Sequence, residues 1–220
     1  MCNFAPKNHK TLQNDKTIKH LIFDLGGVLV DLDRNACITA FEKLGFKNVE
    51  TFLGDYGQKD IFRLFETGAI TEPEFYDLVR AQLPNPVSDQ LIANAFNAFL
   101  LSVNPLKTTL LNRLKKNRFV SMLSNVNPIH FNSVLQRAWN GNPYHIYDCF
   151  NHLFLSYELH LCKPDPEIYR KVVEISGFKP EETLFFDDSA ANIEAAQDLG
   201  FNTCLISKDY SILDYFAYLN

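Results

Sequence analysis

The chain has no long hydrophobic run. No apolar stretch approaches the ~20 residues that a membrane-spanning helix needs. Residues 1–17 are polar and contain no apolar core segment, so they lack the pattern of a signal peptide and predict a flexible leader. Internal repeats and low-complexity tracts are also missing. We therefore expect a cytoplasmic globular protein without a membrane partner.

Paired cysteines and an excess of positive charge are missing as well. The five cysteines are widely spaced without a C-x-x-C pair, which argues against a zinc site or a disulfide framework and predicts free thiols. Lys and Arg number 21 against 26 Asp and Glu, a formal net charge of −5. The one basic run, at residues 115–118, is interpreted as the solvated end of a helix. Nucleic acid is not an expected partner, because binding it needs a positive surface.

Short apolar runs alternate with helical patterns over most of the chain. A length of 220 residues with 46% hydrophobic content is enough for a sizeable core. The predicted strands are Ile18–Phe23, Phe119–Leu123, Leu153–Ser156, Thr183–Phe186 and Asn202–Ile206. The helices predicted between them are Leu106–Lys116, Pro128–Trp139, Pro166–Ser176 and Ala190–Leu199. This alternation predicts an α/β fold with a doubly wound, Rossmann-like parallel sheet.

Residues 34–100 interrupt the alternation with helices alone. The predicted helices are Arg34–Leu44, Asp60–Glu66, Glu72–Gln82 and Asp89–Leu100. We expect a small helical cap at 34–100, inserted into a core domain made of residues 18–33 and 101–220. The spacing of four aromatic residues indicates that they pack inside the cap rather than line a site: Phe52, Tyr56, Phe62 and Phe65.

Four short polar pieces stand next to these elements. Three follow predicted strands, and the third piece in chain order opens a helix: they are Asp24-Leu25-Gly26-Gly27, Ser124-Asn125, Lys163-Pro164-Asp165-Pro166 and Asp187-Asp188-Ser189. In an open parallel sheet, ligands bind beyond the carboxyl ends of the strands. We therefore expect the four pieces to meet in one site.

The residue types in these pieces suit a phosphate and a divalent cation. Asp24, with an ordinary pKa of about 3.9, would be ionised at neutral pH and could attack phosphorus. The hard oxygens of Asp24, Asp187, Asp188 and the Gly26 carbonyl suit Mg²⁺. One Mg²⁺ and Lys163 would balance the charge of the three carboxylates.

Hydrogen-bond donors and helix caps account for the remaining polar residues. The Ser124 hydroxyl and the Asn125 amide can donate to phosphate oxygens. Asp165 and Ser189 stand where side chains cap the helices that follow. Two further acidic residues precede the Arg34 helix, and we favour helix capping over catalysis for both, Asp31 and Asp33.

The four pieces resemble, in order and character, the motifs of the haloacid dehalogenase-like (HAD) hydrolases. Phe-Asp-Leu-Gly-Gly-Val-Leu-Val-Asp and Leu-Cys-Lys-Pro-Asp-Pro-Glu-Ile-Tyr look like the branch with alpha-glucose-1-phosphate phosphatases and the phosphatase half of soluble epoxide hydrolases. The resemblance implies a Mg²⁺-dependent phosphatase of a small phosphorylated metabolite, a sugar phosphate among the options, acting as a monomer or weak homodimer. It implies catalytic Asp24, Ser124 and Lys163, substrate-binding Gly27 and Asn125, and metal-binding Asp24, Gly26, Asp187 and Asp188.

Gly26 departs from the family's phosphatase pattern, which has a second Asp there as general acid and base. Losing such a group costs about 10²–10⁴-fold in rate. Three interpretations stay open: a substrate with an acidic leaving group such as a sugar 1-phosphate, a proton donor elsewhere such as Asp31, Asp33 or a cap residue, or a poor catalyst that binds a phosphorylated ligand. A 2-haloacid dehalogenase also lacks this Asp and is the alternative enzyme. The Asp187-Asp188 pair favours the phosphatase.

Overall fold

The computed structural model describes residues 17–49 and 61–217. The predicted leader, apart from Thr17, lies outside the described residues, and so do Phe52 and Tyr56.

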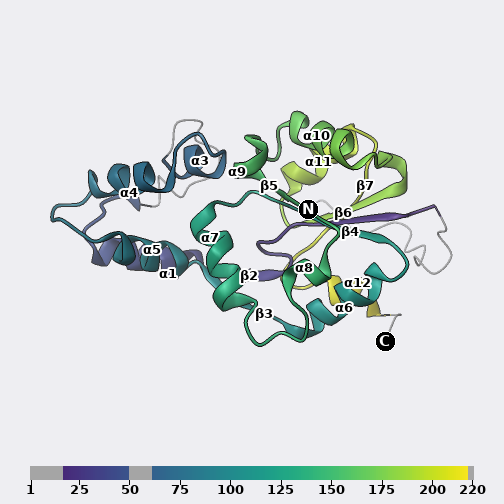
Figure 1. Cartoon of the computed structure of the whole chain (residues 1–220), viewed down its shortest axis with the longest axis horizontal. Coiled ribbons are helices and arrows are strands. Elements are labelled where there is room, and N and C mark those ends of the chain that lie inside the picture. The colour runs from purple at the N-terminus through teal and green to yellow at the C-terminus, as the bar shows by residue number, and fades with distance from the viewer. Residues whose placement is uncertain (1–16, 50–60, 218–220) are drawn as a thin grey trace, which may run out of the picture.

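A five-stranded, all-parallel sheet forms the centre of the molecule (Figure 1). Its order is β5 (His152–Leu155), β4 (Phe119–Ser124), β1 (His20–Phe23), β6 (Thr183–Asp187) and β7 (Asn202–Leu205). The strand order switches direction around β1, which is the doubly wound topology. The predicted α/β fold is confirmed.

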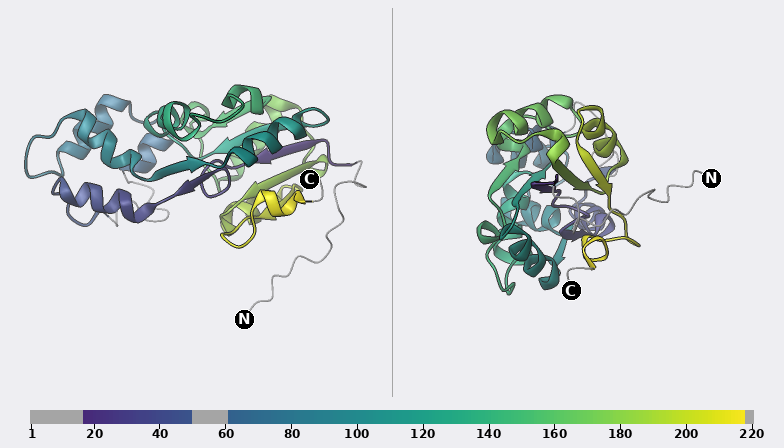
Figure 2. Two further views of the ribbon diagram at one scale, coloured as in Figure 1. Left: turned by 90° about the horizontal axis from the view of Figure 1, so that it is seen from below. Right: turned by 90° about the vertical axis from the view of Figure 1, so that its right-hand side faces the viewer.

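Helices cover both faces of the sheet, because successive strand residues point to opposite sides. Leu21 and Phe23 belong to one cluster with α6 (Pro105–Lys115) and α12 (Ile212–Tyr215). Ile22, between them, belongs to the cluster of α10 (Pro166–Ser176) and α11 (Ala190–Asp198). Figure 2 shows the helices on either side of the sheet. The near-continuous burial of the three central strands, β4, β1 and β6, follows from this double cover.

The helical insert forms a second body at one end of the molecule (Figure 1). It contains α1 (Arg34–Lys43), α3 (Ile61–Glu66), α4 (Glu72–Arg80) and α5 (Asp89–Asn97). Its core is aromatic: Phe62 and Phe65 are buried against Phe75, whose ring stacks on Phe65 at 4.4 Å between centroids. The expectation that Phe62 and Phe65 pack inside the insert is confirmed.

A core helix, α7 (Pro128–Ser133), connects this body to the sheet. Ile129 joins the aromatic cluster of the insert, and the buried His130 ring lies 3.8 Å from the Phe96 ring. His130 Nε2 lies 3.1 Å from the Phe96 carbonyl oxygen. Because α7 begins four residues after Ser124, the insert is packed directly against the segment that leaves the candidate site.

A two-stranded antiparallel ribbon joins the insert to the core, and it was not predicted. β2 (Val30–Leu32) pairs with β3 (Leu100–Val103). The helix predicted to reach Leu100 is wrong at its end, because α5 stops at Asn97 and the chain turns into β3. The ribbon depends on a partner about seventy residues away, which local periodicity does not reveal.

Smaller differences concern element ends. The first strand begins at His20 rather than Ile18, and Ser156 opens α9 (Ser156–Leu159) instead of ending β5. The helix predicted at Pro128–Trp139 divides into α7 and a π-helical segment, η1 (Val134–Ala138). Two further short helices complete the described chain: α8 (Ile146–Cys149) and η2 (Pro180–Glu182).

Helix capping explains several of the polar residues. Asp33 accepts a hydrogen bond from the Ala36 amide at the start of α1, and Asp165 accepts one from the Glu167 amide at the start of α10. These two expectations are confirmed. The capping role expected of Asp31 is wrong, because Asp31 lies within β2 and its carboxylate pairs with Lys107 at 3.3 Å. Ser189 occupies the cap position of α11, but its side chain makes no capping hydrogen bond.

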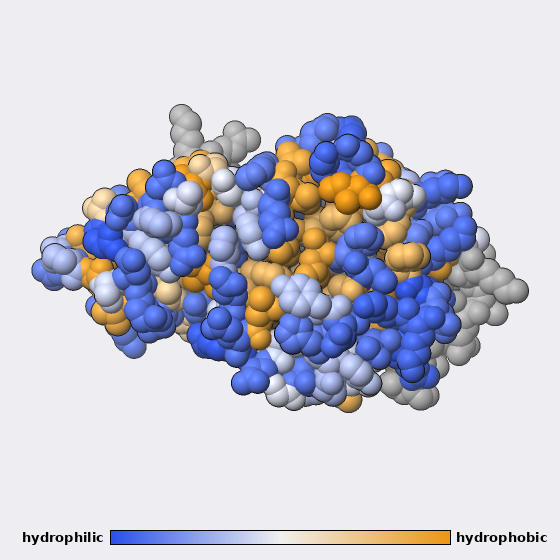
Figure 3. Space-filling view, viewed as in Figure 1, coloured by the Kyte–Doolittle hydropathy of each residue, from blue (hydrophilic) through white to orange (hydrophobic). Residues whose placement is uncertain are grey.

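The surface view is mostly hydrophilic, with hydrophobic residues gathered over the sheet between α10 and α8 (Figure 3). Within the described residues, no helix is long and apolar enough to cross a membrane. Four cysteines fall in the described part and all are free thiols, as predicted: Cys37, Cys149, Cys162 and Cys204.

Candidate active site

The carboxyl ends of three neighbouring strands bring the predicted residues together. The register pairs Phe23 with Phe186 and with Met122, so Asp24 stands level with Asp187 on one side. Ser124 ends β4 on the other side and is buried. The carboxylate oxygens of Asp24, Asp187 and Asp188 approach within 4.8 Å of one another. Residues separated by more than 160 positions in the chain thus share one site.

Lys163 lies at the centre of this site and is 1% exposed. Its ammonium group contacts Asp24 Oδ1 at 2.9 Å and donates to Asp187 Oδ2 at 2.6 Å and to the Leu123 carbonyl oxygen at 3.0 Å. Three acceptors match the three protons of an ammonium group. Lys163 therefore offsets the charge of the two carboxylates, and its ammonium nitrogen also lies over the Phe185 ring, 5.4 Å from the ring centroid.

Asn125 holds the segment that carries Lys163. Its side-chain amide donates to the Lys163 carbonyl oxygen and its Oδ1 accepts from the Lys163 backbone amide, both at 2.8 Å. This double hydrogen bond joins the end of β4 to the loop before α10. The side chain of Asn125 thus positions Lys163. The contact to phosphate predicted for Asn125 would come from its backbone amide, which follows Ser124.

Asp187 is engaged almost entirely with the protein. Oδ2 accepts from Lys163, and Oδ1 accepts from the Ser189 amide at 2.8 Å and from Asn192 Nδ2 at 2.9 Å. Asn192 was missed by the sequence interpretation; its position in the first turn of α11 is the only local signal that it faces Asp187. These contacts fix Asp187 as the anchor of the carboxylate cluster, while Asp188 is its exposed member.

Burial and like charges control the acidity of the site. Burial raises the pKa of Asp24 to about 7, against the opposing effect of Lys163. Loss of solvent and the neighbouring Asp187 raise the pKa of Asp188. Burial alone would lower the pKa of Lys163, but Asp187 and Asp24 outweigh it and raise that pKa. The ordinary acidity expected for Asp24 is thus corrected: without a bound cation, burial leaves its carboxylate only partly ionised near neutral pH.

The charges and donor atoms fit a divalent cation. Three carboxylates and one ammonium sum to −2, which a Mg²⁺ ion would neutralise. All the grouped ligand atoms are carboxylate oxygens, the hard donors that Mg²⁺ prefers. Asp24 and Asp188 would hold the ion with Asp187 behind them. The Gly26 carbonyl stays a predicted ligand at the same turn.

Two glycines shape the turn after Asp24. Gly27 has φ +69°, and a Cβ atom there would lie 2.1 Å from Asp188 Oδ2. The Gly27 amide donates to the Val30 carbonyl oxygen at 2.9 Å, which closes the turn. At Gly26 a Cβ would meet Leu32 Cδ1 at 3.0 Å, the end of a flexible side chain. Of these two glycines, only Gly27 has a positive φ and also a position where a Cβ would collide with a candidate metal ligand, Asp188.

Replacing Gly27 with alanine should therefore damage the cation site. The new methyl group overlaps the Asp188 carboxylate, so we expect Gly27→Ala to weaken Mg²⁺ binding at least about tenfold and to lower turnover with it. Isothermal titration with Mg²⁺ measures the first effect. Gly177→Ala is the matched control, because Gly177 has φ +68° but nothing within 4 Å of a Cβ. Equal losses of Mg²⁺ affinity in both variants would contradict the steric argument.

Comparisons with known proteins identify the family of the chain. The family model of haloacid dehalogenase-like hydrolases matches residues 18–200. D-ribitol-5-phosphate phosphatase of Bacteroides thetaiotaomicron is 34% identical over 186 residues, 84% of this chain and 90% of that protein. The crystal structure of a HAD-family enzyme from the same organism, in complex with magnesium and inorganic phosphate, has a TM-score of 0.83 and 41% identity and covers 89% of this chain and 98% of that one.

A shorter match supports the predicted branch. Bifunctional epoxide hydrolase 2 of Rattus norvegicus is 36% identical over 64 residues, 29% of this chain and 12% of that protein. The resemblance drawn from the motifs is confirmed, and so is the expectation of a hydrolase with this fold. The chain belongs to the haloacid dehalogenase-like hydrolase family.

Proposed function

We propose that the protein is a Mg²⁺-dependent phosphatase that hydrolyses a small phosphorylated metabolite through an aspartyl-phosphate on Asp24. The observation that carries the proposal is the buried cluster of Asp24, Lys163 and Asp187 beside Asp188. Its net charge of −2 calls for a cation before any phosphate can approach. The magnesium and phosphate held by the related crystal structure support the same pairing of ligands.

The chain's own residues would divide the reaction between them. An Asp24 carboxylate oxygen attacks phosphorus, the bond from phosphorus to the leaving oxygen breaks, and water then attacks the aspartyl-phosphate to release phosphate. Lys163 holds Asp24 in place and offsets its charge, and Ser124 donates to a phosphate oxygen. Bound Mg²⁺ would supply Lewis-acid polarisation of the phosphoryl group. Because position 26 is glycine, we assign the proton of the leaving oxygen to water.

The substrate is inferred to be a polyol or sugar phosphate. The relative from Bacteroides thetaiotaomicron acts on D-ribitol 5-phosphate, in which a primary alcohol leaves. A sugar 1-phosphate has a more acidic leaving group and remains the substrate that suits Gly26 best. Residues 34–100 are proposed as the cap that selects between them, because the helical body packs on α7, close to Ser124.

A haloacid dehalogenase is the less favoured function. Its chemistry needs a carboxylate nucleophile but no cation, which leaves the clustering of Asp187 and Asp188 beside Asp24 without a role. The similarity to solved dehalogenases is at 21% identity and reflects the fold alone. The non-catalytic binding module is less favoured because both nucleophile and ammonium partner are in contact.

Phosphate release in the presence and absence of metal tests the proposal. We expect Mg²⁺-dependent release from p-nitrophenyl phosphate, and a loss of about 10³-fold or more on adding EDTA that excess Mg²⁺ restores. A panel of ribitol 5-phosphate, sugar 6-phosphates and sugar 1-phosphates ranks the substrates. Undiminished release in EDTA would contradict the metal requirement. Chloride release from 2-chloropropionate, with no phosphate release from any substrate, would instead favour the dehalogenase.

Restoring a carboxylate at position 26 tests the role of the missing acid-base group. We expect Gly26→Asp to raise turnover of ribitol 5-phosphate by about 10-fold or more and to help sugar 1-phosphates less. The Leu32 side chain must move slightly to admit the new Cβ. Gly26→Asn is the matched control, with the same size and no acid. Equal gains on both substrate classes, or an equal gain with Asn, would contradict the leaving-group argument.

A further inference from the structure

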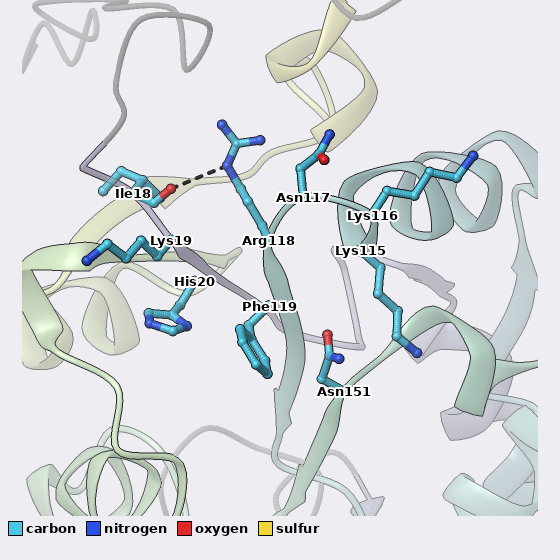
Figure 4. A pocket seen from close by; sticks show the side chains of 9 residues that line it. All are labelled: Ile18, Lys19, His20, Lys115, Lys116, Asn117, Arg118, Phe119 and Asn151. Carbon is cyan, nitrogen blue, oxygen red and sulfur yellow. Dashed lines mark hydrogen bonds between the residues drawn. The ribbon is translucent and has the colours of Figure 1, made fainter.

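A cavity of about 750 Å³ lies at the amino ends of the strands (Figure 4). This is the end of the sheet opposite to Asp24, which follows the carboxyl end of β1. His20 opens β1 and Phe119 opens β4, and both line the cavity. Asp24 follows the last residue of β1, so the strand separates the cavity from the candidate active site. The volume falls in the range of small-molecule sites, about 300–1,000 Å³.

The lining of this cavity is positively charged, although the whole chain carries −5. It includes Lys19, Lys115, Lys116 and Arg118 but no Asp or Glu. Lys19 has a carboxylate partner, Glu182, at 2.8 Å. Lys115 instead donates to two backbone carbonyl oxygens, of Asp148 and Phe150, at 2.9 Å each. The basic run at 115–118 is thus part of a concave site rather than only the solvated end of a helix.

Two of these lysines form no salt bridge within the part of the chain that the structure describes. Among the salt bridges of the described residues, none involves Lys115 or Lys116. A second cavity of about 370 Å³ is also lined by both lysines, together with Asn112, Tyr144 and Asp148. Because the first cavity has no carboxylate in its lining, it is the one in which the charge of Lys115 and Lys116 favours an anion.

An exposed aromatic ring lies beside the cations. Phe119 is 49% exposed, which is unusual for a phenylalanine that opens a central strand. Its ring is supported by His20 at 5.7 Å and Phe178 at 6.0 Å between centroids. Asn151 adds a polar group: its Oδ1 accepts from the Val120 amide, so its NH₂ is the group that remains for a ligand. A flat ring, a polar amide and cations together match a ligand that carries both an aromatic ring and phosphate.

We propose that this cavity binds a nucleotide, with the base against Phe119 and the phosphates on Lys116 and Lys115. Stacking of a base on an exposed aromatic ring and charge-assisted hydrogen bonds to phosphate are two interactions by which proteins bind nucleotides. The polar segment before Thr17 carries Lys7, Lys10 and Lys16 against one acid, Asp15, so its charge does not complement the site. The inference is independent of the proposed phosphatase.

Titration of the full chain with ADP in EDTA tests the proposal. Without a cation the carboxylate cluster around Lys163 repels anions, so binding reports the cavity. We expect ADP to bind with a dissociation constant below 1 mM, and Lys116→Gln and Phe119→Ala each to weaken it at least about fivefold. Pyrophosphate should also bind, and only Lys116→Gln should weaken pyrophosphate. Lys171→Gln and Leu91→Ala, on exposed side chains elsewhere, should change neither.

Several results would overturn the proposal. They are no ADP binding at 1 mM, ADP binding unchanged in both cavity variants, or equal loss of pyrophosphate affinity in Phe119→Ala. A short single-stranded oligonucleotide that binds more tightly than ADP would also overturn it and assign the surface to nucleic acid. Turnover of p-nitrophenyl phosphate with Mg²⁺ should stay within about twofold in both variants, because the cavity lies at the opposite ends of β1 and β4. A larger loss would contradict a separate site.

Discussion

Asp24→Asn should abolish turnover while making the metal-free protein more stable. The amide cannot attack phosphorus, so we expect phosphate release to fall by about 10⁴-fold or more. The same change removes one of three clustered negative charges. Burial raises the pKa of Asp24, which means that its charged form destabilises the metal-free folded protein. Asp198→Asn, on the exposed end of α11, is the matched control and should leave both properties unchanged. Substantial release by Asp24→Asn would remove Asp24 from the role of nucleophile.

The stability gain of Asp24→Asn should depend on pH with a definite sign. The pKa of Asp24 is about 4 in the unfolded chain and about 7 in the folded one, so the folded state holds the proton more tightly. The free energy of unfolding of the metal-free protein therefore falls as pH rises through this window. At pH 8 the variant should be more stable by roughly 2–4 kcal/mol, and near pH 4 the difference should vanish. Thermal unfolding in EDTA measures both, and a gain that is equal at pH 4 and pH 8 would contradict the charge argument.

Lys163→Met should damage both catalysis and folding. The lysine is buried between Asp24 and Asp187, so its loss leaves two buried carboxylates without a counter-charge. Removing one partner of a buried ion pair typically costs about 3–5 kcal/mol. Turnover should fall by about 10³-fold or more even where the protein stays folded, because the nucleophile loses its orienting contact. Chemical denaturation and phosphate release at low temperature measure the two effects separately.

A double variant separates lost charge from lost packing. If uncompensated charge causes the instability of Lys163→Met, adding Asp24→Asn should restore at least about 1–2 kcal/mol and no activity. Methionine has an unbranched stem of similar shape, so the packing of that stem changes little, and the contact of the ammonium group with the Phe185 ring is lost together with the charge. Lys171→Met on the exposed face of α10 is the control and should be neutral. A double variant as unstable as the sum of both single changes would contradict this account.

Local sequence signals were sufficient for the fold and for the identity of the central residues. Apolar runs followed by Asp24, Ser124 and Asp187 predicted parallel strands with polar carboxyl ends, because burial on both faces requires such runs. Helix ends were predictable where a side chain caps its own helix, as at Asp33 and Asp165. The ribbon of β2 and β3 was not predictable, since each strand exists only through a distant partner.

The sequence by itself thus determined the alternating elements, the order of the four polar pieces and the chemical type of each group, because these depend on residues close together in the chain. Only the tertiary structure decided how those groups act on one another. It placed Lys163 between two carboxylates and raised the pKa of Asp24. It brought Asn125 into contact with the backbone of Lys163 and Asn192 into contact with the Asp187 carboxylate. It also gathered Lys115, Lys116 and Phe119 around a cavity. Burial, the distances between charged groups and charge compensation depend on contacts between segments far apart in the chain, so no local sequence pattern predicts them.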